Sequence, residues 1–239
     1  MTLSDTDVVI LGGSSGIGLA VAQATAGEGA RVTIASSSQT RLDAALAMLP
    51  VWSQGRVLDV SKASAVEAFF EETGAIDHLV YTAAENLRLM PLDGMDIAAA
   101  RSFFELRYWG ALTAAKAARR HLRTTGSIVL TSGTAGARPG SGWGIAASIC
   151  GAMEGLTRAL AVELAPLRVN VVAPGVVRTP LWDGMDAASR DAFYAAESKR
   201  LPVGHVGEAE EIAQAYTYLM RQTYVSGQVL HVDGGGLLA

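Results

Sequence analysis

The sequence contains a single cysteine, few charged residues and no long apolar run. One cysteine, Cys150, among 239 residues excludes an internal disulfide and a metal site built on cysteines. No apolar run approaches the roughly 18 residues of a membrane-spanning helix, and the N-terminal MTLSDTD lacks the basic flank of a signal peptide. The four histidines have no spacing typical of metal ligands. We therefore expect a cytoplasmic protein with no metal site and no membrane partner.

The sequence also lacks a cluster of positive charge. The 19 Lys and Arg residues are scattered and the net charge is -4, so no basic stripe can follow a phosphate backbone. This excludes nucleic acid as a partner. Only 18% of the residues are charged, 50% are hydrophobic, and the mean hydropathy is +0.27. Such an apolar surplus predicts that a second copy of the chain covers part of the surface.

What the sequence does contain is a regular alternation of strand and helix patterns. Seven apolar runs of strand length lie at 7–12, 31–36, 55–60, 77–83, 126–132, 167–173 and 228–232. Helical periodicity fills the intervals, most clearly over 96–123 and 142–164. The alternation predicts an α/β fold with a parallel sheet of about seven strands, helices on both faces, and ligands at the carboxyl ends of the strands.

No linker or repeat divides the chain, so we expect one domain over residues 1–239. The segment 176–206 is the one long excursion between regular elements. It is predicted to close over the crevice as a substrate loop.

A glycine-rich turn, GGSSGIG, follows the first predicted strand and opens the next helix. Gly12 permits the tight turn, Gly16 lets a diphosphate approach bare backbone, and Gly18 allows the helix to pack closely on the strand. The N–H groups and dipole at the start of that helix favour an anion. The predicted diphosphate site consists of Gly12, Ser14, Ser15, Gly16, Ile17 and Gly18.

The second predicted strand ends in ASSSQTR and carries no carboxylate. An acidic residue there would bind the adenosine ribose and repel a 2'-phosphate. Ser36, Ser37 and Ser38 offer hydroxyls instead, and Arg41 follows one turn later. The segment favours NADP(H) over NAD(H), although the same serines could simply form a polar helix cap.

With these features together, the chain resembles the short-chain dehydrogenase/reductase family along its whole length. The matching motifs are GGSSGIG, LDV at 58–60, GSIVLTSGTAG at 126–136, GLTRALAVELA at 155–165, RVNVVAPGVVRT at 168–179 and SGQVLHVDGG at 226–235. The resemblance implies a single Rossmann-type, doubly wound domain and an NADP(H)-dependent oxidoreductase of small carbonyls or alcohols. It also implies a homo-oligomer, expected to be a tetramer, that associates through the helices 96–123 and 142–165.

The resemblance assigns further cofactor contacts beyond the glycine-rich turn. Asp59 and Val60 are expected beside the adenine, and PGVVRT along the nicotinamide half. The remaining predicted contacts are Thr82, Ala83, Ala84, Thr131, Pro174, Gly175, Val176, Val177 and Thr179.

The catalytic residues of the family do not appear at the expected positions. Counted without gaps, the family's asparagine, serine, tyrosine and lysine fall on Arg107, Gly133, Ala146 and Cys150, and no Y-x-x-x-K occurs elsewhere in the chain. In the family, the tyrosine donates a proton to the carbonyl as hydride arrives. A positioned acid of this kind contributes about 10²- to 10⁴-fold to the rate, so its loss slows the reaction without forbidding it.

Other side chains could carry the proton instead. The candidates are Tyr81, Arg107, Ser132, Ser148 and Cys150. Three of them have a purely structural interpretation. Cys150 could be a small side chain packed in the core, Tyr81 could fill space left by shorter neighbours, and Arg107 could pair with Glu85 or Glu105. Ser132 is expected to point away from the site, because side chains alternate along a strand.

Three functions therefore stay open. The first is an NADP(H)-binding oxidoreductase with a non-standard or weak active site. The second is a pseudoenzyme, a sensor or partner subunit whose output is cofactor binding. The third is a redox-neutral enzyme, such as an isomerase or lyase, in which the cofactor is structural.

Overall fold

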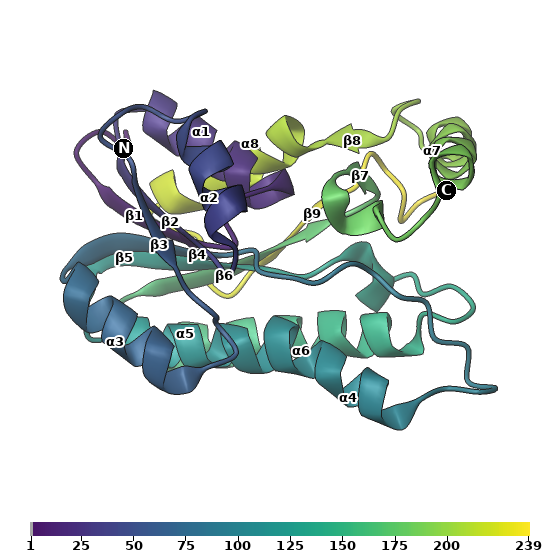
Figure 1. Cartoon of the computed structure of the whole chain (residues 1–239), viewed down its shortest axis with the longest axis horizontal. Coiled ribbons are helices and arrows are strands. Elements are labelled where there is room, and N and C mark those ends of the chain that lie inside the picture. Colours follow the sequence, from purple (N-terminus) through teal and green to yellow (C-terminus); the bar gives the residue numbers. More distant parts are fainter. Residues whose placement is uncertain (1) are drawn as a thin grey trace.

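The computed structural model describes residues 2–239 and contains a parallel sheet of seven strands in the order β3-β2-β1-β4-β5-β6-β9 (Figure 1). The strands are β1 (Asp7–Leu11), β2 (Arg31–Ser36), β3 (Gln54–Val57), β4 (Ile76–Tyr81), β5 (Leu122–Thr131), β6 (Arg168–Pro174) and β9 (Val229–Val232). All six strand pairings are parallel. The predicted α/β class and the seven predicted strands are confirmed.

Two layers of helices cover the sheet. Figure 1 shows α1 (Gly16–Gly27), α2 (Gln39–Leu46) and α8 (Ala209–Arg221) on one face. On the other face lie α3 (Ala63–Thr73), α4 (Ile97–Phe104), α5 (Gly110–Ala118) and α6 (Gly144–Glu163). Alternate residues of β1 enter the two cores: Val9 and Leu11 pack toward α3, α5 and α6, while Val8 and Ile10 pack toward α1 and α8. Burial on both faces explains why the strands read as continuous apolar runs.

The segment predicted as a helix over 96–123 is continuously helical from Ile97 to Ala118 and ends before the predicted residue 123. A π-helical segment, η1 (Glu105–Trp109), lies between α4 and α5. The carbonyl of Leu106 accepts a hydrogen bond from the hydroxyl of Tyr81, at the end of β4. Such single-turn π segments widen a helix and often occur at functional sites. The sequence pattern does not reveal the π-helical turn, because the partner of Leu106 comes from a distant strand.

Two strand ends differ from the prediction by three residues or more. β5 begins at Leu122 rather than 126, because Leu122 pairs with Ile76 across a register shift. β3 ends at Val57 rather than 60, which leaves Leu58, Asp59 and Val60 in the loop that follows.

The excursion 176–206 is ordered by its own small core. It contains β7 (Val177–Arg178), the 3-10 turn η3 (Pro180–Trp182) and α7 (Ala187–Arg200), and β7 pairs with β8 (Gly207–Glu208). Trp182 and Tyr194 pack with Leu201 and Val206. The excursion also contacts the loop after β4, since the N–H of Leu87 donates to the carbonyl of Leu181 at 3.1 Å.

By length and composition, α6 could cross a membrane, contrary to the expectation that no segment could. It is the one such helix within residues 2–239, with a mean hydropathy of 1.3 over its best window. Its inner face packs on the sheet through Ile149, Met153, Thr157 and Leu160. Only 22% of that window is buried in the single chain, so α6 leaves a mainly apolar outer face.

Candidate active site

A cavity of about 630 Å³ opens at the carboxyl ends of the central strands. Its walls are the turn after β1, the loops after β2 to β6, the π segment η1, the start of α6 and the excursion. The predicted cofactor residues that line it are Gly12, Ser14, Ser15, Gly16, Ile17, Gly18, Ser36, Ser37, Arg41, Asp59, Val60, Thr82, Ala83, Ala84, Thr131, Pro174, Gly175, Val176, Val177 and Thr179. Of the predicted set, Ser38 alone does not line the cavity. The fold therefore gathers segments that lie far apart in the sequence along one crevice.

The glycine-rich turn leaves no room for side chains. Gly12 has φ +92°, and a Cβ there would run into the backbone of Ala83. A Cβ on Gly18 would meet the carbonyl oxygen of Gly12 and the hydroxyl of Thr82. The N-cap residue of α1, Ser15, makes no side-chain hydrogen bond to the first helical turn. The backbone N–H groups of that turn thus face the cavity without a side-chain cap, an arrangement that fits a phosphate group.

The serines after β2 have three different environments. Ser36 is buried, and its hydroxyl oxygen accepts hydrogen bonds from the Ser14 hydroxyl at 2.8 Å and the Ser38 N–H at 3.3 Å. The hydroxyl of Ser38 accepts from the N–H of Arg41 and caps α2, so the alternative role of helix cap applies to this residue. Ser37 and the side chain of Arg41 are exposed along the cavity. The candidate 2'-phosphate site therefore has fewer available groups than the three serines predicted, because only Ser37 and Arg41 are exposed along the cavity.

The loop after β4 places the carboxyl of Glu85 in the cavity. From the sequence, Glu85 is expected only as a possible partner of Arg107. The Oε2 atom of Glu85 lies 3.2 Å from Nε of Arg107, and Nη2 of Arg107 donates to the backbone carbonyl of Glu85. The guanidinium also lies 5.6 Å from the ring centroid of Phe103. Burial raises the pKa of the Glu85 carboxyl, and the positive charge of Arg107 opposes that rise. Of the two partners considered for Arg107, the structure selects Glu85.

Comparisons with known proteins show the family of the chain. A family model described as enoyl-(acyl carrier protein) reductase matches residues 12–236. The chain is 35% identical, over 252 residues and 99% of both chains, to short-chain dehydrogenase/reductase ATR9 of Stachybotrys chlorohalonatus. The chain belongs to the short-chain dehydrogenase/reductase family.

Two solved structures are similar over the full length. One is a small-chain dehydrogenase in complex with NADPH, with 36% identity and a TM-score of 0.87, covering 99% of this chain and 100% of that one. The other is the MalC reductase/Diels-Alderase of Malbranchea aurantiaca, with 32% identity and a TM-score of 0.92, covering 99% of this chain and 98% of that one. The predicted family and fold are therefore confirmed.

The four positions on which the family's catalytic residues are predicted to fall line one region of the cavity. They are Arg107, Gly133, Ala146 and Cys150. A Cβ on Gly133 would lie 3.4 Å from Sγ of Cys150, an ordinary contact. Burial raises the pKa of the Cys150 thiol, which keeps it protonated and poorly nucleophilic.

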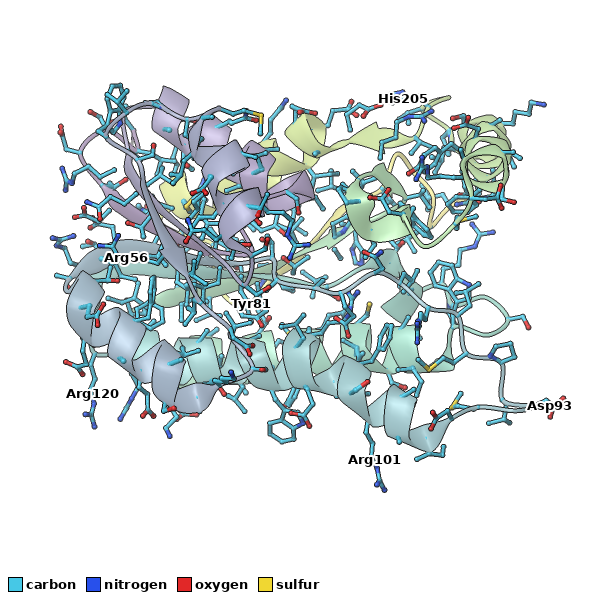
Figure 2. The ribbon with its side chains drawn as sticks, in the orientation of Figure 1. Arg56, Tyr81, Asp93, Arg101, Arg120 and His205 are labelled. Carbon is cyan, nitrogen blue, oxygen red and sulfur yellow. The ribbon has the colours of Figure 1, made fainter. Side chains whose placement is uncertain are left out.

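The other predicted proton donors are engaged in structural hydrogen bonds. Tyr81 is buried between the two helix layers (Figure 2), its hydroxyl donates to the Leu106 carbonyl, and burial raises the pKa of the phenol. Ser148 does not line the cavity, and its hydroxyl donates to the carbonyl of Gly144 at 2.8 Å. Ser132 does line the cavity, contrary to expectation, but its hydroxyl donates to the Cys150 carbonyl at 3.2 Å. None of these three hydroxyls is positioned as a ready acid.

No metal site accompanies these groups. Within the described residues 2–239, no cluster of three or more His, Cys, Asp or Glu side chains could hold a metal ion.

Proposed function

We propose that the chain binds NADP(H) in this cavity and reduces a small carbonyl compound with a non-standard active site. The observation that carries the proposal is the continuity of the cavity. It runs from the glycine-rich turn at the start of α1 to the region around Ala146, and both regions are lined by residues of the family's motifs. When bound, the cofactor supplies the hydride.

Three regions of the cavity would hold the cofactor. The first turn of α1, from Ser15 to Gly18, would bind the diphosphate through backbone N–H groups. Asp59 and Val60 would lie beside the adenine, and segment 174–179 along the nicotinamide half. The NADPH complex of a similar protein, with 36% identity, supports the binding of a nicotinamide cofactor.

The preference for NADPH over NADH rests on the end of β2. No carboxylate lies there, and Ser37 and Arg41 are exposed where a 2'-phosphate is expected. Titration of the chain with NADPH and NADH, followed by nicotinamide fluorescence, tests the preference. Tighter binding of NADPH is expected. Equal affinities would contradict the role of Ser37 and Arg41.

Turnover is tested separately, by incubating the NADPH-loaded chain with small activated ketones such as diacetyl and trifluoroacetophenone. We expect slow NADPH consumption with formation of an equal amount of alcohol. Tight NADPH binding without consumption across a broad panel would instead support a pseudoenzyme that acts as a sensor or partner subunit.

A second candidate function is a redox-neutral conversion in the same cavity. The similarity to a protein described as a reductase/Diels-Alderase, at 32% identity, favours this alternative, because that name couples reduction with a reaction that transfers no hydride. A substrate converted at equal rates with NADPH and NADP⁺, with no change in the cofactor, would support it. Reduction that requires NADPH would contradict it.

The chain works as a cytoplasmic homo-oligomer, expected to be a tetramer, without nucleic acid or membrane partners. The apolar outer faces of α4, η1 and α6 support self-association, with Ile97 57%, Trp109 51% and Val162 81% exposed in the single chain. Light scattering at micromolar concentration tests the assembly, and a monomeric mass would contradict it.

A further inference from the structure

The cavity contains few groups that can carry a proton. Its titratable side chains within residues 2–239 are Arg41, Asp59, Tyr81, Glu85, Glu105, Arg107 and Cys150. Asp59 lies at the end predicted for the adenine, and the Tyr81 hydroxyl is held by the Leu106 carbonyl. Arginine does not release its proton in proteins. Glu85, Glu105 and Cys150 remain, and of these only Glu85 is a half-buried carboxyl.

Glu85 lies directly beside the region of the family's catalytic groups. It follows the carboxyl end of β4 by four residues, and its partner, Arg107, occupies the position predicted for the family's asparagine. Arg107 also acts electrostatically on the thiol of Cys150, at the position predicted for the family's lysine. Arg107 therefore connects the carboxyl of Glu85 to the region where a reacting carbonyl would lie.

The ion pair is incomplete as a hydrogen-bonded unit. Oε2 of Glu85 and Nε of Arg107 are buried and 3.2 Å apart, yet within residues 2–239 neither atom makes a hydrogen bond of good geometry. Arg107 is fixed independently by the backbone carbonyl of Glu85 and the ring of Phe103. The Glu85 side chain keeps 31% of its surface exposed and lines the cavity. A carboxyl in this arrangement can reorient toward a ligand without breaking a bidentate pair.

We propose that Glu85 donates the proton that accompanies hydride transfer, and that Arg107 positions both the Glu85 carboxyl and the oxygen of the substrate. This proposal rests on the proposed function and adds the group that replaces the family's tyrosine. Arg107 is a positioning residue, because its guanidinium holds its own protons throughout.

The atoms and charges balance in this step. The hydride forms a new C–H bond at the carbonyl carbon, the C=O π bond breaks, and the Glu85 carboxyl proton forms the new O–H bond. The substrate leaves as an alcohol and the cofactor as NADP⁺. Glu85 is left as a carboxylate that regains a proton from water, because its side chain is partly exposed.

The charged and titratable groups around Glu85 fix the direction of the pH dependence. Burial raises the pKa of its carboxyl, Arg107 on η1 opposes the rise, and the phenol of Tyr81 on β4 is neutral. Glu105 on η1 and the neutral thiol of Cys150 on α6 line the same cavity. A substrate that covers the carboxyl removes more water and raises the pKa further. Only the protonated form donates, so the rate of reduction falls as the pH rises through the pKa of Glu85.

The test compares the wild-type chain with Glu85→Gln, Glu85→Asp and the control Glu72→Gln, which changes an exposed carboxyl on α3 that does not line the cavity. Trifluoroacetophenone is the substrate, and NADPH binding is measured first by fluorescence. Glu85→Gln should bind NADPH within about twofold of the wild type and lose roughly 100-fold or more in turnover. Glu85→Asp should keep part of the rate and a pH-dependent limb, and Glu72→Gln should resemble the wild type.

Two further measurements distinguish proton donation from a structural role. Arg107→Gln removes the charge that lowers the pKa of Glu85, so the falling limb of the rate should move to higher pH. Infrared difference spectra between the wild type and Glu85→Gln should show a protonated carboxyl band above the pH at which an exposed glutamate ionises. The band requires no turnover.

The outcomes separate the two proposals. A wild-type chain that binds NADPH but reduces no ketone overturns the reductase, and the role of Glu85 with it. An active wild type whose rate and pH profile survive in Glu85→Gln overturns the role of Glu85 alone. Absence of the carboxyl band also overturns it.

Discussion

The two ends of the cavity are built from different kinds of groups. At the end lined by Gly12 and Gly18, the backbone forms the walls and an added methyl group would collide with Ala83 or Thr82. At the end lined by Gly133 and Ala146, side chains contribute to the walls, and a methyl group added at Gly133 meets only ordinary contacts. A backbone cradle depends on close approach, so it tolerates almost no substitution. A site made of side chains can exchange its chemistry while the fold persists.

The same comparison explains how the second end accommodates its changes. Gly133 and Ala146 are smaller than the serine and tyrosine that the family has at these positions. Arg107 is larger than the family's asparagine. The guanidinium of Arg107 contacts Phe103 and pairs with Glu85, so the charge does not stand alone in the crevice. The pair of Glu85 and Arg107 therefore lies where the family's proton donors are predicted.

The largest effect is expected at the backbone end. Gly12→Ala forces a residue with φ +92° to carry a Cβ against the backbone of Ala83. Strain and overpacking together should cost about 2 to 5 kcal/mol of unfolding free energy, which lowers the melting temperature by roughly 4 to 20 °C. NADPH affinity, measured well below that temperature, should fall by about tenfold or more, because the turn must shift. Calorimetry and fluorescence titration measure the two effects, and unchanged binding would contradict the backbone cradle.

The next effect tests the side-chain end. Ala146→Tyr, Cys150→Lys, Gly133→Ser and Arg107→Asn restore together the groups that the family alignment predicts. The quadruple variant should catalyse NADPH-dependent reduction of a small activated ketone at least about tenfold faster, which corresponds to a barrier about 1.4 kcal/mol lower. Room for the serine exists, since the nearest atom to an added Cβ is Sγ of Cys150 at 3.4 Å.

The single changes Ala146→Tyr, Cys150→Lys and Gly133→Ser should do little, because catalytic groups that act as a unit are far from additive. Folding, NADPH affinity and oligomeric mass are checked before the rate. A quadruple variant that passes these checks and stays inert would show that the gap-free alignment of α6, or its proximity to the nicotinamide, is wrong.

The sequence predicts the fold well for a physical reason. Every central strand is buried on both faces, so its apolar run is visible without knowledge of its neighbours. The glycine-rich turn is equally visible, because only glycine satisfies its backbone. Both features are local in the chain.

What the sequence could not predict depends on contacts between distant residues. The π-helical turn within the helix predicted over 96–123 involves Tyr81, which lies 25 residues before Leu106. The role of Glu85 depends on Arg107, 22 residues later. Ser36, Ser37 and Ser38 are identical in type, and only the neighbours Ser14 and Arg41 give them different environments.

A smaller effect is expected at the 2'-phosphate position, where side chains rather than backbone meet the cofactor. Arg41→Ala should weaken NADPH binding by about fivefold, roughly 1 kcal/mol, because the contact is exposed to solvent. NADH affinity should not change. Arg56→Ala removes an exposed charge on β3 that does not line the cavity, and it serves as the matched control. Equal losses for NADPH and NADH would assign Arg41 to helix stability instead.

The smallest effect is expected from a substitution in α1, where two glycines of the same helix can be compared. Gly18 and Gly27 lie at opposite ends of α1, and a Cβ on Gly27 would meet nothing within 4 Å. Gly27→Ala removes backbone freedom from the unfolded chain and should therefore stabilise the protein by about 0.5 kcal/mol, a rise of roughly 1 to 2 °C in melting temperature. Gly18→Ala adds the same methyl group against the Gly12 carbonyl and the Thr82 hydroxyl, and it should destabilise the protein and weaken NADPH binding. Calorimetry and fluorescence titration of both variants measure the contrast. If both substitutions lowered stability alike, helix α1 as a whole would be the sensitive feature, and the close approach of backbone at the turn would not explain why glycine is required there.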